Sequence, residues 1–116
     1  MYTELIINGE TYKLRLNTRA SISLEKSMGR NPLIVLMDAA DGKLPKLTDI
    51  ILILQAMLQQ YHHGYNVEKT MDLFDKYVED GNSMIELIPV LLEVFQQSGY
   101  ISKAATEEGQ EEVTKN

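Results

Sequence analysis

The chain has 116 residues, of which 44% are hydrophobic and 24% charged, and it contains no cysteine. This size and composition indicate one globular domain with a buried core, and they exclude a wholly disordered chain, disulfides, thiolate zinc sites and thiol nucleophiles. The formal net charge is −6, which argues against nucleic acid as the main ligand because phosphate neutralisation dominates that affinity.

The first 16 residues predict a β-hairpin over 2–16. Asn8-Gly9 is a strong signal for a type I′ turn, since both central positions of that turn need positive φ. The register then pairs Ile7 with Glu10, Leu5 with Tyr12, Glu4 with Lys13 and Tyr2 with Arg15. One face of the hairpin is expected to carry Thr3, Leu5, Ile7, Tyr12, Leu14 and Leu16.

Five helices are predicted after the hairpin, each with a capping residue at its start. Their expected spans are about 19–28, 32–40, 49–62, 67–80 and 84–97. The expected caps are Thr18, Asn31, Thr48 with Asp49, Asn66, and Ser83 with Glu86. Positions 50–54 are apolar on every side, which predicts that the third helix forms the buried centre of the fold.

These elements place the chain in the α+β class, mostly α, with an N-terminal hairpin followed by about five helices. Residues 1–101 are predicted to form a single globular domain. Apolar periodicity stops at Ser102, and Glu107, Glu108, Glu111 and Glu112 follow among polar residues. The segment 102–116 is therefore expected to be an acidic disordered tail.

Residues that could carry chemistry are few. His62 and His63 are adjacent, so on a regular helix their rings point about 100° apart and do not converge on one metal. Ser21, Ser23 and Ser27 lie in no nucleophile motif, and the seven glycines form no phosphate-binding loop. The sequence predicts that the protein is not an enzyme and has no catalytic residue, cofactor or metal site.

One patterned surface stands out on the fourth predicted helix. At about 100° per residue, Glu68, Asp72, Asp75 and Glu79 form a narrow acidic stripe. The opposite side, expected to turn inward, carries Val67, Thr70, Met71, Phe74, Tyr77 and Val78. The stripe is either a solvated helix face, the usual meaning of such charges, or a docking strip for a basic helical partner.

The expected location is the cytoplasm. Met1–Glu4 contains no basic region before an apolar run, so no signal peptide is predicted. The apolar stretches Ile50–Leu54 and Ile85–Leu92 are far shorter than the ~20 residues that cross a bilayer. No membrane partner is expected.

A series of short blocks resembles the tail assembly chaperones of long-tailed bacteriophages and prophages of Gram-positive bacteria. The order and spacing of the blocks carry the resemblance over roughly residues 11–101. The blocks are Tyr12-Lys13-Leu14-Arg15-Leu16-Asn17-Thr18-Arg19, Leu24-Glu25-Lys26, Gly29-Arg30-Asn31-Pro32-Leu33, Ile53-Leu54, Leu58-Gln59, His63-Gly64-Tyr65, Leu73-Phe74-Asp75-Lys76-Tyr77, Gly81 and Phe95-Gln96-Gln97-Ser98-Gly99-Tyr100.

The resemblance implies a non-enzymatic role in virion assembly. Such chaperones bind the long, helical tape measure protein, keep it soluble and help recruit tail tube subunits around it. They work in the cytoplasm of the bacterial host and are absent from the mature virion. The family offers no catalytic residues to carry over.

Two other functions fit the same residues. A structural tail or head-completion protein would assemble through the edge of its hairpin, which also makes a homo-oligomer an expected state. A small phage-encoded regulator would instead bind a host protein. The candidate partner-binding residues are Glu68, Asp72, Asp75 and Glu79.

Overall fold

A two-stranded antiparallel hairpin opens the chain and five helices follow it, which confirms the predicted fold class. The computed structural model describes residues 1–102. Its elements are β1 (Thr3–Ile7), β2 (Glu10–Leu14), α1 (Thr18–Met28), α2 (Pro32–Ala40), α3 (Leu47–Leu58), α4 (Val67–Glu79) and α5 (Met84–Gln97). The predicted tail, apart from Ser102, lies outside the described residues.

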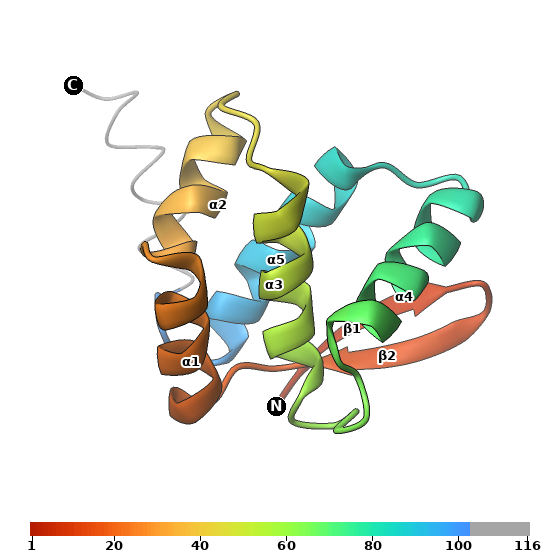
Figure 1. Cartoon of the computed structure of the whole chain (residues 1–116), viewed down its shortest axis with the longest axis horizontal. Coiled ribbons are helices and arrows are strands. Elements are labelled where there is room, and N and C mark those ends of the chain that lie inside the picture. Colours follow the sequence, from red (N-terminus) through yellow and green to blue (C-terminus); the bar gives the residue numbers. More distant parts are fainter. Residues whose placement is uncertain (103–116) are drawn as a thin grey trace.

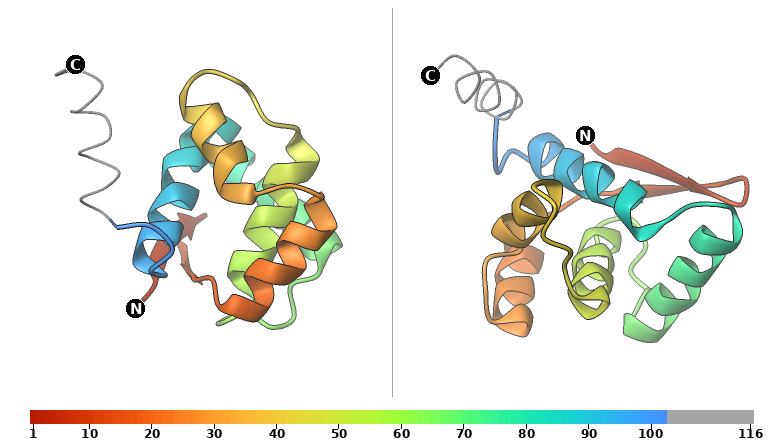
Figure 2. Two further views of the ribbon diagram at one scale, coloured as in Figure 1. Left: turned by 90° about the vertical axis from the view of Figure 1, so that its left-hand side faces the viewer. Right: turned by 90° about the horizontal axis from the view of Figure 1, so that it is seen from above.

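The helices are arranged in two layers. Helices α1, α3 and α4 stand side by side in the front of the molecule, with α3 between the other two (Figure 1). Helix α5 and the hairpin lie behind this row, as the view from above shows (Figure 2, right). Helix α2 packs against α5. The front row therefore places α3 between α1 and α4.

The hairpin has the register that the sequence predicts. Leu5 pairs with Tyr12 and Glu4 with Lys13. Asn8 and Gly9 have φ values of 52° and 81°, as a type I′ turn requires. The inner face is buried against the helices, and it consists of the predicted set Thr3, Leu5, Ile7, Tyr12, Leu14 and Leu16.

Helix α3 is the centre of the core. It packs against α1, α4, α5 and β2. Its fully buried side chains are Ile50, Ile53, Leu54, Met57 and Leu58. Leu52 is the exception in the apolar run, because it stays partly exposed on the front of the molecule. A helix buried on nearly all sides fixes the positions of the helices on either side of it.

Three of the predicted helix caps are present as expected. The side chain of Asn31 accepts from the backbone N–H of Leu33, and that of Asn66 accepts from Lys69. Ser83 and Glu86 form a capping box at the start of α5.

The expected caps of α1 and α3 are wrong. Asn17, not Thr18, caps α1, and its side chain accepts from the N–H of Ala20 at 2.8 Å. Helix α3 begins at Leu47 with no side-chain cap at Lys46. Asp49 does not cap because its carboxylate is buried and paired with the guanidinium of Arg30.

Helix α3 is also shorter at its C-terminus than the predicted 49–62. It ends at Leu58, and a further turn is closed by the N–H of His62 donating to the carbonyl oxygen of Leu58. This turn brings the His62 ring to β2, where Nε2 accepts from the N–H of Lys13 at 3.0 Å. A tertiary contact therefore replaces the last predicted helical turn.

No helix within residues 1–102 is both long enough and apolar enough to cross a membrane.

Candidate functional site

The candidate site is an apolar groove between α3 and α4, on the front of the molecule. It encloses about 330 Å³. Its lining is mostly aliphatic, with one aromatic ring and one carboxylate, and consists of Leu47, Thr48, Ile51, Leu52, Val67, Met71, Phe74 and Asp75. We call it the α3–α4 groove. Helices α3 and α4 diverge toward the start of α3 (Figure 1).

The walls of the groove are unusually open to solvent for large apolar residues. Leu47 in the first turn of α3 is 51% exposed, and Met71 on α4 is 46% exposed. Val67, at the start of α4, is exposed as well. Contiguous exposed apolar side chains commonly mark a surface that binds another molecule.

Sequence reasoning placed part of this groove on the wrong side of α4. Val67, Met71 and Val78 were expected to turn inward, but all three are exposed. The side chains that α4 buries are Thr70, Leu73, Phe74 and Tyr77. The apolar arc of this helix is wider than the strip that the core covers, so its edge remains in solvent.

The predicted acidic stripe borders the exposed apolar edge. Glu68, Asp72, Asp75 and Glu79 are all exposed, and Asp75 also lines the α3–α4 groove. On a helix, Met71 lies about 70° from the centre of the stripe, on the groove side. The structure therefore brings the predicted carboxylates next to an apolar groove that the sequence did not reveal.

The stripe has no internal counterion within residues 1–102. The single ion pair in that part of the chain is between Arg30 and Asp49, far from the stripe in sequence. Lys69 follows Glu68, but its Nζ approaches the loop at Gly64. Like charges four residues apart on a helix destabilise it by a few tenths of a kcal/mol. A basic group from another molecule would remove that repulsion.

The two histidines take separate positions. The His62 ring lies against the rings of Tyr12 and Tyr65, whereas His63 is exposed and lines a different groove. Burial, followed by the charges of Lys13 and His63, lowers the pKa of His62. Within residues 1–102 no three His, Cys, Asp or Glu side chains gather as metal ligands. His62 instead serves the fold by binding β2.

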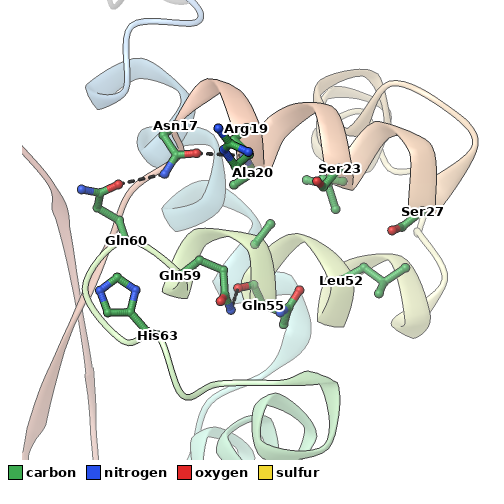
Figure 3. Close-up of a pocket in the computed structure, with 12 residues that line it drawn as sticks. Asn17, Arg19, Ala20, Ser23, Ser27, Leu52, Gln55, Gln59, Gln60 and His63 are labelled. Atoms are coloured by element: carbon green, nitrogen blue, oxygen red, sulfur yellow. Dashed lines mark hydrogen bonds between the residues drawn. The ribbon is translucent and has the colours of Figure 1, made fainter.

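A second groove lies between α1 and α3 (Figure 3). It encloses about 410 Å³, and its lining is rich in amides and hydroxyls: Asn17, Arg19, Ala20, Ser23, Leu24, Ser27, Leu52, Gln55, Ala56, Gln59, Gln60 and His63. We call it the α1–α3 groove. Although His63, Ser23 and Ser27 share it, no hydrogen bond joins the ring to either hydroxyl in the described chain.

Comparison with protein families identifies a match to a family whose function is unknown. A family of unknown function, DUF6096, matches residues 4–115. Comparison with curated proteins found no match, and neither did comparison with solved structures. The family match includes the hairpin except Thr3, all five helices and both grooves. Because it spans nearly the whole chain, this protein belongs to the DUF6096 family.

Proposed function

We propose that this protein is a non-enzymatic assembly chaperone whose α3–α4 groove holds an amphipathic, basic helix of a partner protein. One observation carries the proposal: the exposed apolar side chains of Leu47, Val67 and Met71 lie beside the unpaired carboxylates of the acidic stripe. An apolar groove bordered by charge is a common way to bind an amphipathic helix.

The apolar contacts would supply most of the affinity. Complete burial of a Leu, Val or Met side chain contributes about 1.5–3 kcal/mol. An exposed ion pair contributes about 0.2–1 kcal/mol. Covering Leu47 and Met71 therefore outweighs pairing any one carboxylate of the stripe. The charges would instead speed association and select the orientation of a basic helix.

The α3–α4 groove and the acidic stripe together define the chemistry of the helix that they would bind. It is a helix with apolar residues at i, i+3, i+4 and i+7, which fill the groove, and with Lys or Arg along the flank that meets the stripe. A chain containing many such helices would aggregate through its apolar faces until they are buried. A domain that covers one face transiently keeps that chain soluble.

We propose that the tape measure protein is this partner, on the strength of the sequence resemblance to phage tail assembly chaperones. The role that follows is to keep the tape measure protein soluble in the host cytoplasm and to help recruit tail tube subunits. The chaperone would leave before the virion is complete. The acidic, cysteine-free composition and the open groove support a transient, intracellular binder.

The proposal can be tested by co-expressing the chain with the proposed partner, the tape measure protein, and measuring how much of the tape measure protein is soluble. We expect the wild type to raise the soluble fraction and Met71→Glu to abolish the rise. Ile34→Glu is the matched control, because Ile34 is 51% exposed on α2, away from the groove. No rise with the wild type, or an equal loss with both variants, would reject the proposal.

A second function is favoured by the hairpin. The outer edge of β1 has no hydrogen-bonded neighbour within residues 1–102. The side chain of Ile6, on the same strand, is 60% exposed. A structural tail or head-completion protein would use such an edge to assemble in a permanent complex. The protein would then be found in purified particles, whereas the chaperone is expected to be missing from them.

A further inference from the structure

The α1–α3 groove has a charge opposite to that of the whole chain. The protein carries 17 acidic residues and a net charge of −6. The residues that line this groove include Arg19 and His63 but no Asp or Glu. Helix α1 also has no acidic residue in its first turn, where the positive end of the helix dipole attracts carboxylates. The groove is therefore suited to an acidic ligand.

Hydrogen-bond donors extend along the groove beyond Arg19. The hydroxyls of Ser23 and Ser27 project from exposed positions one turn apart on α1. Neither hydroxyl has a partner within residues 1–102, and Arg19 forms no ion pair there. Asn17 and Gln60 close one end by bonding to each other at 2.8 Å, and Figure 3 places His63 at that same end. Carboxylates that bind along α1 would find a hydrogen-bond donor at each turn, from Arg19, Ser23 or Ser27.

The end of α5 is fixed close to this groove. The hydroxyl of Ser98 accepts from the N–H of Leu16 at 3.0 Å, and the guanidinium of Arg15 donates to the carbonyl oxygen of Gln97. Asn17, the next residue after Leu16, lines the groove. Ser98, four residues before the end of the described chain, therefore lies near the end of the groove that carries Arg19 and His63.

Residues 103–116 have the length and charge to occupy the groove. They contain two glutamate pairs, Glu107-Glu108 and Glu111-Glu112. Extended, this segment reaches about 45 Å, whereas the 11 residues of α1 extend about 16 Å. The family match continues through residue 115, so it covers both glutamate pairs.

We propose that residues 103–116 dock within the same molecule in the α1–α3 groove. The glutamates would face Arg19, His63 and the hydroxyls of Ser23 and Ser27. The two grooves have only Leu52 in common, so the docked segment leaves the α3–α4 groove open. This inference does not depend on the proposed chaperone function.

The absence of cysteine allows a direct test on the full chain. Gln110→Cys, between the glutamate pairs, gives a single site for a nitroxide label. We expect the label to reduce the amide NMR signals of Ser23, Ser27 and Gln59 by at least half, and to leave those of Val67 and Met71 unchanged. Salt at 0.5 M should restore the signals, because exposed charges are screened at that ionic strength. Signals that stay unchanged in the groove at low salt would overturn the proposal.

Two comparisons make the test specific. Arg19→Gln with His63→Gln should restore the groove signals, whereas Lys43→Gln, an exposed cation in the loop before α3, should not. A mixture of labelled unenriched protein with unlabelled ¹⁵N protein separates contacts between molecules from those within one. Loss of signal in that mixture would overturn docking within the same molecule. Equal effects of all the variants would overturn the role of Arg19 and His63.

Discussion

The backbone N–H of Lys13 donates to Nε2 of His62 across 3.0 Å, so a side chain completes the outer edge of β2. The N–H of Arg15, two residues on, donates to the carbonyl oxygen of Met57 at the same edge. Because Nε2 accepts a hydrogen bond, the His62 ring must be neutral with its proton on Nδ1. The hairpin is thus tied to the end of α3 by a contact that protonation breaks.

Acid should weaken the fold through His62. Its pKa is lowered in the folded protein, chiefly by burial, so the unfolded chain binds a proton more readily. His62 therefore contributes its full stability above the unfolded pKa of about 6.5, and loses it as pH falls toward the lower folded pKa. Urea unfolding between pH 7.5 and 5 should show this decline in the wild type.

The control for His62 is a glutamine, which can accept the same hydrogen bond without titrating. His62→Gln should flatten the pH dependence in this range, whereas His62→Leu should lower stability at pH 7.5 by about 1–3 kcal/mol, because the Lys13 N–H loses its acceptor. An identical pH profile for wild type and His62→Gln would show that other groups cause the decline.

The Arg30–Asp49 pair should be worth more to the fold than its surface position suggests. Asp49 is buried, while the Arg30 side chain is 48% exposed. Arg30→Ala leaves a buried carboxylate without its partner, so we expect a loss of about 1–3 kcal/mol in thermal or urea unfolding. Asp72→Ala, which removes an exposed carboxylate with no ion pair, should change stability by less than about 0.5 kcal/mol. Equal effects of the two variants would contradict this view.

Local signals explain which parts of the fold could be predicted. The hairpin follows from Asn8-Gly9 and the alternation on either side of it, and these signals agree with each other. The caps at Asn31, Asn66 and Ser83 also need only neighbouring residues. Both ends of α3 depend instead on distant partners, Arg30 at its start and Lys13 near its end. No pattern within α3 contains that information.

The candidate site was predictable only in part, for a similar reason. A helical wheel is enough to find the acidic stripe on α4. It does not tell how much of the apolar arc the neighbouring helix covers, and so Met71 and Val78 were placed in the core. The α1–α3 groove depends on the positioning of two helices whose facing residues are small or polar, such as Ala20 and Ser23. Such residues leave little apolar periodicity to detect.

Charge reversal should separate the two contributions to partner binding. Glu68→Lys with Asp75→Lys should weaken binding of the co-expressed partner several-fold at low salt, and the difference from wild type should shrink at 0.5 M salt. Met71→Glu should weaken binding at both salt concentrations, since apolar burial is not screened. Glu93→Lys, an exposed position on α5, is the control. If the double variant binds as tightly as the wild type at low salt, the stripe is only a solvated helix face and does not bind the partner.

The open edge of β1 leads to the last prediction. Lys13 and Arg15 direct their N–H groups outward to α3 and its following turn, so Glu4, the partner of Lys13, must direct its backbone groups to the opposite, outer edge. Ile6, two residues along the strand, directs its backbone groups to the same outer edge. These groups have no hydrogen-bond partner within residues 1–102. An unpaired edge of this kind is a template for another strand.

We expect two copies to pair antiparallel through β1. Centring the pair on Leu5 aligns the whole strand, Thr3–Ile7, and sets Glu4 opposite Ile6 of the other copy, so that the two glutamates do not face each other. Light scattering on the full chain at rising concentration should show a dimer. Ile6→Lys should shift it toward monomer, because edge lysines oppose strand pairing, whereas Ile34→Lys on α2 should not. A monomer at every concentration would mean that the hairpin is held by its own helices alone, since two strands are too few to be stable without further packing.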